Sequence, residues 1–410
     1  MPAVSAPRRS PLLPIFLIVL VDVMGLTIIL PLLPFYAEQY GASPFVVGLL
    51  ITAYAACQLI SGPILGRVSD RVGRRPLLIL SQCGTFIGFL VLALSDHLWM
   101  VFVARVIDGA TAGNLSLAQA YIADVTSPED RAKSFGVIGI AFGIGFLIGP
   151  AFSGFLSQWG YHWPIVAAMA MSAGSILCTY SLLPPGPPPQ ETDGAGLPAG
   201  RRLGVLDWRG YVQYFRRPVL AGRLLQFFLF IIAFSTFTSG FALFCERRFT
   251  WNDHPFGPRE VGYIFAYVGF LGMILQGKLI GPLVDRFGEQ RLALAGFVAA
   301  AVAYLGLGFT YGIPLLLVVA TVSAFGTGVL RPALTSQITH AAGRHEQGAV
   351  LGLTQSLSSV AMIIMPLVGT ALIEHHELAA WAMVAGAAVG VGAIVATATL
   401  RDQPQPDATA

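Results

Sequence analysis

The sequence predicts an all-α membrane protein with twelve transmembrane helices in two pseudo-symmetric six-helix bundles. Three observations predict this class: the composition, twelve apolar runs of spanning length, and a motif that recurs in the second half. Hydrophobic residues make up 55% of the 410 residues, and charged residues only 11%. Such a chain cannot cover its surface with polar side chains, whereas a bilayer accepts apolar side chains on every outward helix face.

Each apolar run is long enough for a helix of about 20 residues, which crosses a hydrocarbon core of about 30 Å. The expected spans are residues 12–36, 45–66, 76–95, 99–122, 133–157, 162–183, 219–244, 260–282, 291–311, 313–338, 347–373 and 378–400. The first run follows Arg8 and Arg9 but is too long for the apolar region of a signal peptide, so we expect a retained helix.

Lys and Arg residues in the loops indicate the orientation, because they concentrate on the cytoplasmic side of membrane proteins. Placing the N-terminus in the cytoplasm puts seventeen of them on that side and three, Arg247, Arg248 and Arg259, on the other. We therefore expect an integral, multi-pass protein of the plasma membrane, the inner membrane in a bacterium, with both termini cytoplasmic. The four cysteines lie in or beside apolar runs, which favours small core residues over disulfide partners.

The longest loop divides the chain into residues 1–183, a cytoplasmic linker 184–218, and residues 219–410. The second part of the linker mixes apolar and basic residues as an amphipathic surface helix does, although an ordered linker without further role fits equally well. The two halves repeat at an offset of 215 residues: Gly66, Asp70, Arg71 and Gly73 recur as Gly281, Asp285, Arg286 and Gly288. Duplicated six-helix units are the architecture of many secondary transporters.

Two motifs connect the chain to a known family. The run from Gly66 to Pro76 reads G-R-V-S-D-R-V-G-R-R-P, and the fifth span contains G-I-G-F-L-I-G-P-A-F-S-G. Both resemble signatures of the major facilitator superfamily, and the chain is most similar to its twelve-helix drug:proton antiporters of the tetracycline-efflux branch. The resemblance implies a secondary active transporter that exports small amphiphilic compounds, tetracycline-like or other drugs, in exchange for protons by alternating access.

The first motif implies a conformational latch between the halves. Gly66 and Gly73 suit tight backbone turns. By resemblance, Asp70 lies against the N-terminus of the eleventh helix near Glu346, where the helix dipole favours a carboxylate. The other residues expected in this latch are Arg71, Arg74, Asp124, Arg131, Asp285 and Arg286. The alternative is that these charges only set the topology.

The second motif places Gly145, Gly149, Pro150 and Gly154 in the fifth span. Small residues allow close contact between helices, and a proline bends a helix. By resemblance, this is a signature of exporters rather than importers. We therefore expect these four residues to serve helix packing in an antiporter.

Charged residues inside the spans are a further functional signal, because each costs about 2.5–3.5 kcal/mol at the bilayer centre on insertion scales. Asp22 lies about ten residues into the first span, and Arg105 and Asp108 lie one turn apart in the fourth. By resemblance, Arg105 takes part in proton transfer. We expect Asp22 to carry the exchanged proton, with Arg105 and Asp108 completing the proton-coupling group. The alternative is a buried Asp and Arg pair that serves packing only.

An aromatic run and scattered amides are the expected lining of a cavity for amphiphilic cargo. These residues are Asn114, Gln119, Gln226, Phe230, Phe234, Gln276, Gln337 and Gln355. The alternative for the phenylalanines is a place against lipid or other helices. Relatives in the tetracycline-efflux branch have further acidic residues in the third and ninth spans. Because residues 76–95 and 291–311 contain none, strict tetracycline specificity is not expected.

The sequence contains no GxxxxGK[ST] motif, no metal-ligand set and no nucleophile and base pair. We therefore expect no enzyme activity, cofactor, metal, nucleotide or nucleic-acid partner. The expected partners are a small-molecule substrate, protons and the lipid bilayer, and the expected state is a monomer. Two alternatives stay open: an importer or facilitator of a small metabolite, and a transporter-like receptor that moves nothing.

Overall fold

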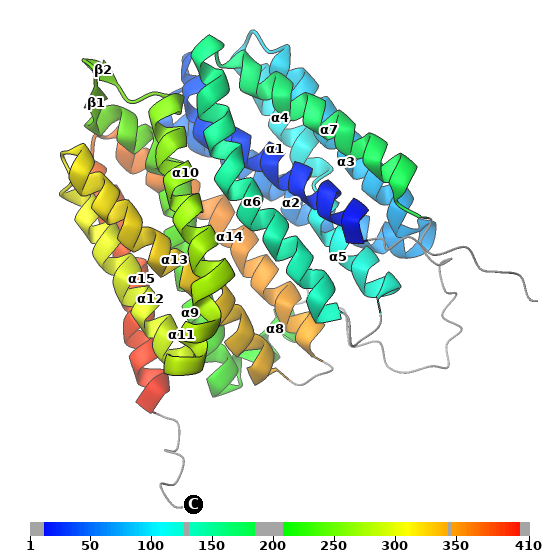
Figure 1. Cartoon of the computed structure of the whole chain (residues 1–410), viewed down its shortest axis with the longest axis vertical. Helices are drawn as coiled ribbons and strands as arrows, with labels where there is room; N and C mark the ends of the chain where they lie inside the picture. Colours follow the sequence, from blue (N-terminus) through cyan, green and yellow to red (C-terminus); the bar gives the residue numbers. More distant parts are fainter. Residues whose placement is uncertain (1–11, 127–130, 185–207, 343–345, 402–410) are drawn as a thin grey trace, which may run out of the picture.

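The computed structural model describes residues 12–126, 131–184, 208–342 and 346–401, which form a bundle of long helices (Figure 1). The N-terminal group consists of α1 (Leu12–Glu38), α2 (Pro44–Val72), α3 (Arg74–Ala93), α4 (Leu98–Ala110), α5 (Asn114–Val125), α6 (Arg131–Leu156), the 3₁₀ turn η1 (Ser157–Trp159) and α7 (His162–Leu182). The C-terminal group consists of α9 (Pro218–Arg248), α10 (Pro258–Ile274), the π-helical turn η2 (Leu275–Leu279), α11 (Ile280–Phe287), α12 (Glu289–Gly308), α13 (Ile313–Ala341), α14 (Gln347–Glu374) and α15 (Leu378–Arg401). The short helix α8 (Trp208–Phe215) precedes α9.

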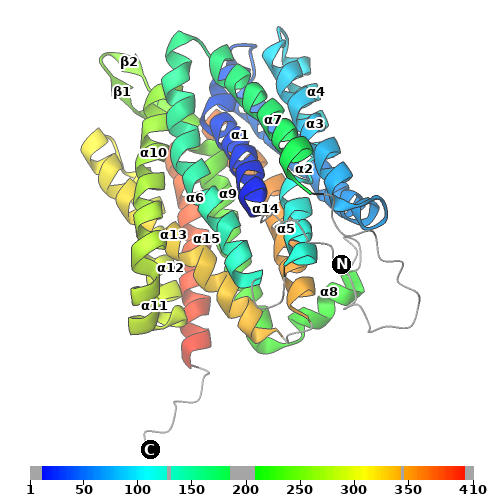
Figure 2. The same ribbon diagram turned by 45° about the vertical axis from the view of Figure 1, so that its right-hand side comes forward.

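Two short strands, β1 (Thr250–Trp251) and β2 (His254–Pro255), form an antiparallel hairpin between α9 and α10. Figures 1 and 2 show this hairpin at one end of the bundle and α8 at the other. We call these the hairpin end and the linker end. Asn252 and Asp253 make the hairpin turn with φ of 49° and 63°, the left-handed region that Asn and Asp tolerate best after glycine.

Eleven helices among the described residues are long and apolar enough to cross a membrane. One of them combines α10, η2 and α11 into a continuous span of 30 residues. The expected fourth span is absent from the eleven because it is divided into α4 and α5, each too short by itself. The two pieces together occupy the expected length, so the structure is consistent with twelve crossings.

The expectation of a continuous fourth helix is wrong, because α4 ends at Ala110 and α5 begins at Asn114. Ser81 of α3 bridges the break: its hydroxyl donates a hydrogen bond to the Thr111 carbonyl and accepts one from the Gly113 N–H at 3.0 Å. Backbone groups at membrane depth must find partners within the protein. Ser81 supplies such partners, which permits the break and sets Asn114 at the start of a new helix.

The G-R-V-S-D-R-V-G-R-R-P motif is more helical than the sequence suggests. Because α2 continues to Val72, Gly66 lies inside the helix and the tight turn expected there is wrong. Gly73 alone forms the turn, with φ of 105°, and Gly288 takes the same place in the second copy with φ of 75°. Only glycine adopts such angles without steric cost.

The two groups of helices share one hydrophobic core at the hairpin end. It contains Phe35 and Leu50 from the N-terminal group and Phe244 and Trp381 from the C-terminal group. Toward the linker end the cores are separate. One is built from α1, α3, α5 and α6, and another from α8, α9 and α12 to α15. In the part of the chain that the structure describes, apolar packing therefore joins the groups at the hairpin end.

Two helix pairs, α2 with α14 and α6 with α10, make the main contacts between the groups. Glycines allow these helices to approach closely. A Cβ atom at Gly48 of α2 would lie 2.9 Å from the Pro366 carbonyl oxygen of α14, and one at Gly269 of α10 would lie 2.8 Å from the Phe146 carbonyl oxygen of α6. Because the neighbouring atoms are backbone, a larger residue at either position would force the helices apart.

Gly269→Ala should destabilise the protein by about 1–3 kcal/mol, because its methyl group would overlap the backbone of α6. Gly272→Ala is a matched control on the same helix, since no atom lies within 4 Å of a Cβ there. Thermal unfolding of both purified variants in detergent should show a lower melting temperature for Gly269→Ala alone. Equal melting temperatures would contradict the close packing of α6 and α10.

Candidate functional site

Asp22 of α1 accepts a hydrogen bond from the side-chain amide of Asn114. Asn114 is the first residue of α5 and is only 6% exposed, so the helix break fixes its position. The pair borders a small pocket with Gln82 and Phe89 of α3 and Ser172 of α7. Asp22 therefore faces the interior of the N-terminal group.

Asn114 connects Asp22 to the charged residues of α4. Its amide nitrogen lies 3.5 Å from the Thr85 hydroxyl oxygen, and that hydroxyl lies beside the Asp108 carboxyl group. Arg105 Nη2 lies 3.3 Å from Asp108 Oδ2. One polar chain, which we call the acidic network, thus runs from Asp22 through Asn114, Thr85 and Asp108 to Arg105.

The arginine end of the network is enclosed by protein. Arg105 is 5% exposed and Asp108 8%, and the Tyr54 ring of α2 lies 5.8 Å from the guanidinium carbon. Arg105 Nε and Asn114 Oδ1 have no hydrogen-bond partner within the described structure. An unsatisfied buried polar group costs about 1–3 kcal/mol, so the network is a costly way to fill space between helices. Ionisable groups kept at such cost inside spans mark routes for ions or protons.

The first copy of the latch motif forms an ion cluster at the linker end. Arg74 Nη2 lies 2.6 Å from Asp70, and Arg74 Nε lies 2.9 Å from Asp124. Glu346, the expected neighbour of Asp70, makes two hydrogen bonds with Arg217, at 2.6 and 2.9 Å. In this conformation the structure therefore brings Asp70, Arg74 and Asp124 together on the N-terminal group.

The other latch residues are not part of this cluster. Arg71, Asp285 and Arg286 are exposed, and the Arg286 guanidinium carbon lies 5.5 Å from the ring centroid of Phe287. The side chain of Arg131 lies outside the described residues. Among the described residues, the second copy thus lacks the arrangement of the first. Glu289 and Gln290 stand where the first copy has Arg74 and Arg75.

The glycines of the α6 motif pack α6 against two helices at once. A Cβ atom at Gly149 would lie 2.8 Å from Thr27 Cβ of α1, and the Thr27 hydroxyl donates a 2.9 Å hydrogen bond to the Gly145 carbonyl. Gly154 and the Pro150 carbonyl lie against α10 of the C-terminal group. The motif therefore holds α6 close to α1, which carries Asp22, and to α10, its neighbour in the C-terminal group.

Two of the glutamines expected in a cavity lie inside the C-terminal group. The fully buried Gln226 donates a hydrogen bond to the Thr399 hydroxyl of α15 at 3.0 Å. Gln337 of α13 donates to the Glu289 carbonyl of α12, also at 3.0 Å. Both amides tie neighbouring helices together, so in this conformation they do not form a lining with Asn114.

The remaining expected lining residues are also spread apart. Phe230 is 2% exposed, and its ring packs on Phe234 with centroids 5.9 Å apart in the core of the C-terminal group. Gln119, Gln276 and Gln355 are exposed on α5, η2 and α14. The structure therefore places only Asn114 of the eight in the acidic network.

The arrangement of helices and motifs agrees with one protein family. The family model of the Major Facilitator Superfamily matches residues 15–280 and 277–410. The chain belongs to this superfamily. Tetracycline resistance protein, class B, of Escherichia coli is 32% identical over 379 residues, which are 89% of this chain and 88% of that protein. Multidrug resistance protein 2 of Bacillus subtilis is 26% identical over 367 residues, 88% of this chain and 89% of that protein.

A solved structure shares the superfamily fold. The crystal structure of the human organic anion transporter MFSD10 superposes with a TM-score of 0.72 at 24% identity, covering 96% of this chain and 100% of that one. These findings confirm the fold class and the family resemblance that the sequence indicates. The protein is an integral, multi-pass member of a superfamily of transporters.

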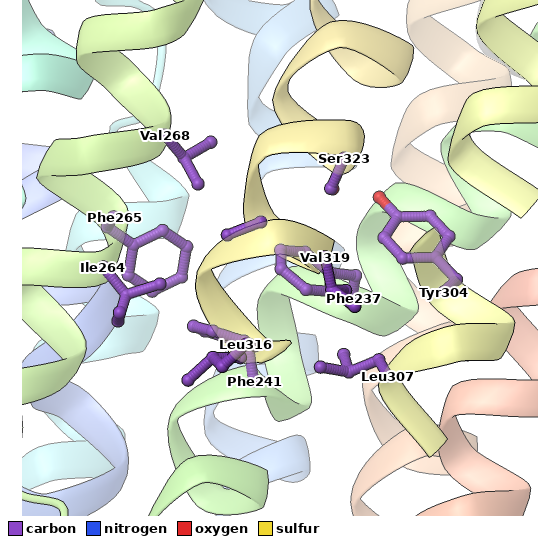
Figure 3. Close-up of a pocket in the computed structure, with 11 residues that line it drawn as sticks. Phe237, Phe241, Ile264, Phe265, Val268, Tyr304, Leu307, Leu316, Val319 and Ser323 are labelled. Atoms are coloured by element: carbon purple, nitrogen blue, oxygen red, sulfur yellow. The ribbon is translucent and has the colours of Figure 1, made fainter. Parts of the chain in front are cut away.

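The two halves of this superfamily member differ at the acidic network. At the repeat offset of 215 residues, the counterparts are Ala320 for Arg105, Ser323 for Asp108 and Tyr304 for Phe89. Figure 3 shows Phe237 beside Tyr304, whose hydroxyl points toward Ser323, among aliphatic side chains. The Phe237 and Tyr304 rings stack with centroids 5.1 Å apart. Ionisable groups of this network therefore occur in the N-terminal half, and an aromatic cluster takes their place in the C-terminal half.

Sequence analysis does not single out Thr85 or Tyr54, although both contact the network. A single hydroxyl residue or tyrosine inside a span is too common to indicate a functional site. The repeat offers one clue, because the counterpart of Thr85 at the offset of 215 residues is Ala300, which cannot bridge two polar groups.

Arg105→Leu should lower stability by about 3–5 kcal/mol, because it leaves the buried Asp108 without its cation. The double variant Arg105→Leu with Asp108→Leu should recover most of this loss, since an apolar pair carries no uncompensated charge. Thermal unfolding in detergent measures both. A double variant no more stable than Arg105→Leu would contradict pairing of these two residues.

Proposed function

We propose that the protein is a secondary active transporter that exports small amphiphilic compounds in exchange for protons by alternating access. The observation that carries this proposal is the acidic network, which connects a carboxyl group within the membrane-spanning helices to a buried arginine. The tetracycline resistance and multidrug resistance proteins to which the chain is similar support drug export. The exporter-type glycine motif of α6 supports the direction.

Proton exchange follows from the chemistry of Asp22. A protonated Asp22 is neutral and suits an apolar surrounding, whereas the carboxylate is favoured by the Asn114 amide and by any positive charge that approaches. Binding of a positively charged cargo near the network therefore favours proton release, and proton binding favours release of that cargo. Thr85 and Asp108 lie between Asp22 and Arg105, so the electrostatic environment of the arginine changes when Asp22 gains or loses its proton.

We propose that the linker end faces the cytoplasm of the bacterial inner membrane, in agreement with the Lys and Arg residues of the loops. Residues 1–183 and 219–410 are then the two moving units, and residues 184–218 join them. The shared core at the hairpin end and the separate cores at the linker end correspond to an inward-facing conformation. Cargo would enter from the cytoplasm in this state.

The proton gradient provides enough free energy for export. One proton moving down a one-unit pH difference releases about 1.4 kcal/mol, and a potential of 100 mV adds about 2.3 kcal/mol. Because spans three and nine lack the additional acids of the tetracycline-efflux branch, we propose a broader range of amphiphilic drugs as cargo. Small-molecule cargo, protons and lipid are the partners, and the monomer is the proposed unit.

Asp22→Asn should abolish proton-coupled transport, because an amide cannot exchange a proton at this position. Everted membrane vesicles with an imposed acidic interior measure this through accumulation of tetracycline and of a cationic dye, and through the fall of the pH gradient on adding either. Asp253→Asn, a change of the exposed hairpin turn, is the control and should transport as the unchanged protein does. Undiminished coupled transport by Asp22→Asn would remove this residue from the mechanism.

The same vesicles separate the proposal from its alternatives. Loss of compound from the vesicles under the acidic interior would favour import. No flux for a broad compound panel in reconstituted liposomes, with the protein correctly folded, would favour a receptor that moves nothing.

A further inference from the structure

A contact at the hairpin end joins the two groups of helices through a helix cap. Glu374, the last residue of α14, accepts hydrogen bonds from the Phe45 N–H and the Ser43 hydroxyl, each at 2.8 Å. Ser43 is the N-cap residue of α2, and it makes no side-chain hydrogen bond to its own helix. The first N–H groups of a helix lack partners within the helix, and a carboxylate there interacts favourably with the helix dipole. The cap of α2 is thus supplied by a helix of the other group.

The helices that exchange this cap are packed along much of their length. The Thr52 hydroxyl of α2 donates a 2.8 Å hydrogen bond to the Ile363 carbonyl of α14, in addition to the close approach at Gly48. The two helices are antiparallel, so each begins where the other ends. At the linker end, Asp70 lies in the last turns of α2, and Glu346 is the N-cap residue of α14.

We propose that Glu374 is a positioning residue of the transport cycle, which holds the hairpin end closed by capping α2. The inference rests on the proposed alternating access. Each helix of the pair carries an acid near its C-terminus and offers an N-terminus to the acid of its partner. The Glu374 cap forms only while the hairpin ends of α2 and α14 are in contact, so it stabilises the conformation in which that end is closed.

Glu374 acts beside a second link at the same end. Arg247 of α9 lies 2.6 Å from Glu38 of α1 and 2.7 Å from its neighbour Glu246. This ion pair also joins the two groups and remains when Glu374 is changed. Removing the Glu374 carboxylate should therefore shift the balance between the two conformations rather than abolish one of them. A single cap at an exposed helix end corresponds to a change of roughly two- to fivefold in an equilibrium constant.

The test measures the distance between the groups at both ends of the full-length protein. Electron-resonance spin labels at Asp96 and Asn252 report the hairpin end, and labels at Leu182 and Phe287 report the linker end, because all four side chains are exposed. The labels require a background in which the native cysteines Cys57, Cys83, Cys178 and Cys245 are replaced.

Glu374→Gln should raise the population with a long hairpin-end distance and a short linker-end distance roughly two- to fivefold. Asp70→Asn should shift the population in the opposite direction. Glu377→Gln is the matched control, since this exposed acid lies three residues further along and accepts no hydrogen bond from α2. It should leave both distances unchanged.

Two results would overturn the inference. One is an unchanged distance distribution in Glu374→Gln while Asp70→Asn shifts it, which leaves the proposed transport intact. The other is an equal shift in Glu374→Gln and Glu377→Gln, which would show a general effect of charge. If Glu374→Gln does not fold, Ser43→Ala replaces it, because it removes one of the two hydrogen bonds. A smaller shift in the same direction then supports the inference, and no shift overturns it.

Discussion

Satisfying backbone hydrogen bonds inside the membrane is the constraint on which the site depends. The chain breaks its fourth crossing at Thr111 to Gly113, and Ser81 of the neighbouring helix supplies partners for the freed backbone groups. The break allows Asn114 to begin a new helix beside Asp22. In an unbroken helix, the Asn114 side chain would point in a different direction. The acidic network therefore exists because one serine makes an interrupted helix tolerable at this depth.

Duplication provides two similar groups of helices, but the two groups differ in the ionisable residues that they bury. Where the N-terminal group holds Arg105 and Asp108, the C-terminal group holds Ala320 and Ser323. Burying ionisable groups is expensive, and a second copy would double the cost while binding protons independently of the first. An aromatic cluster at the related position fills the same space with apolar contacts (Figure 3). The carboxyl groups of this network therefore belong to the N-terminal group, and the proposed proton exchange takes place there.

The sequence predicts the fold class, the Gly73 turn and the place of Asp22 inside a span. The first follows from the apolar composition, the second from the positive φ that glycine tolerates, and the third from a charged residue within an apolar run. The sequence does not predict the helix break, since Thr111 and Gly113 are ordinary helix residues in membranes and their support comes from Ser81, distant in sequence. It also does not predict that Gln226 and Phe230 face inward within the C-terminal group. In a soluble protein, periodicity separates the buried face of a helix from the wet one. In a membrane both faces of a helix are apolar, so the residue pattern does not show which face is buried in the protein.

The balance between conformations follows from comparing apolar packing with helix caps. Opening the hairpin end would separate the shared core that contains Phe35, Leu50 and Trp381, and each side chain of this size is stabilised by about 1.5–3 kcal/mol when buried. A cap contributes about 0.3–1 kcal/mol, so no single cap can drive that separation. The opposite conformation must instead bury comparable apolar surface by joining the two separate cores at the linker end. Under the proposed alternating access, packing then nearly cancels between the two states, and a contact as small as the Glu374 cap is large enough to change which one is populated.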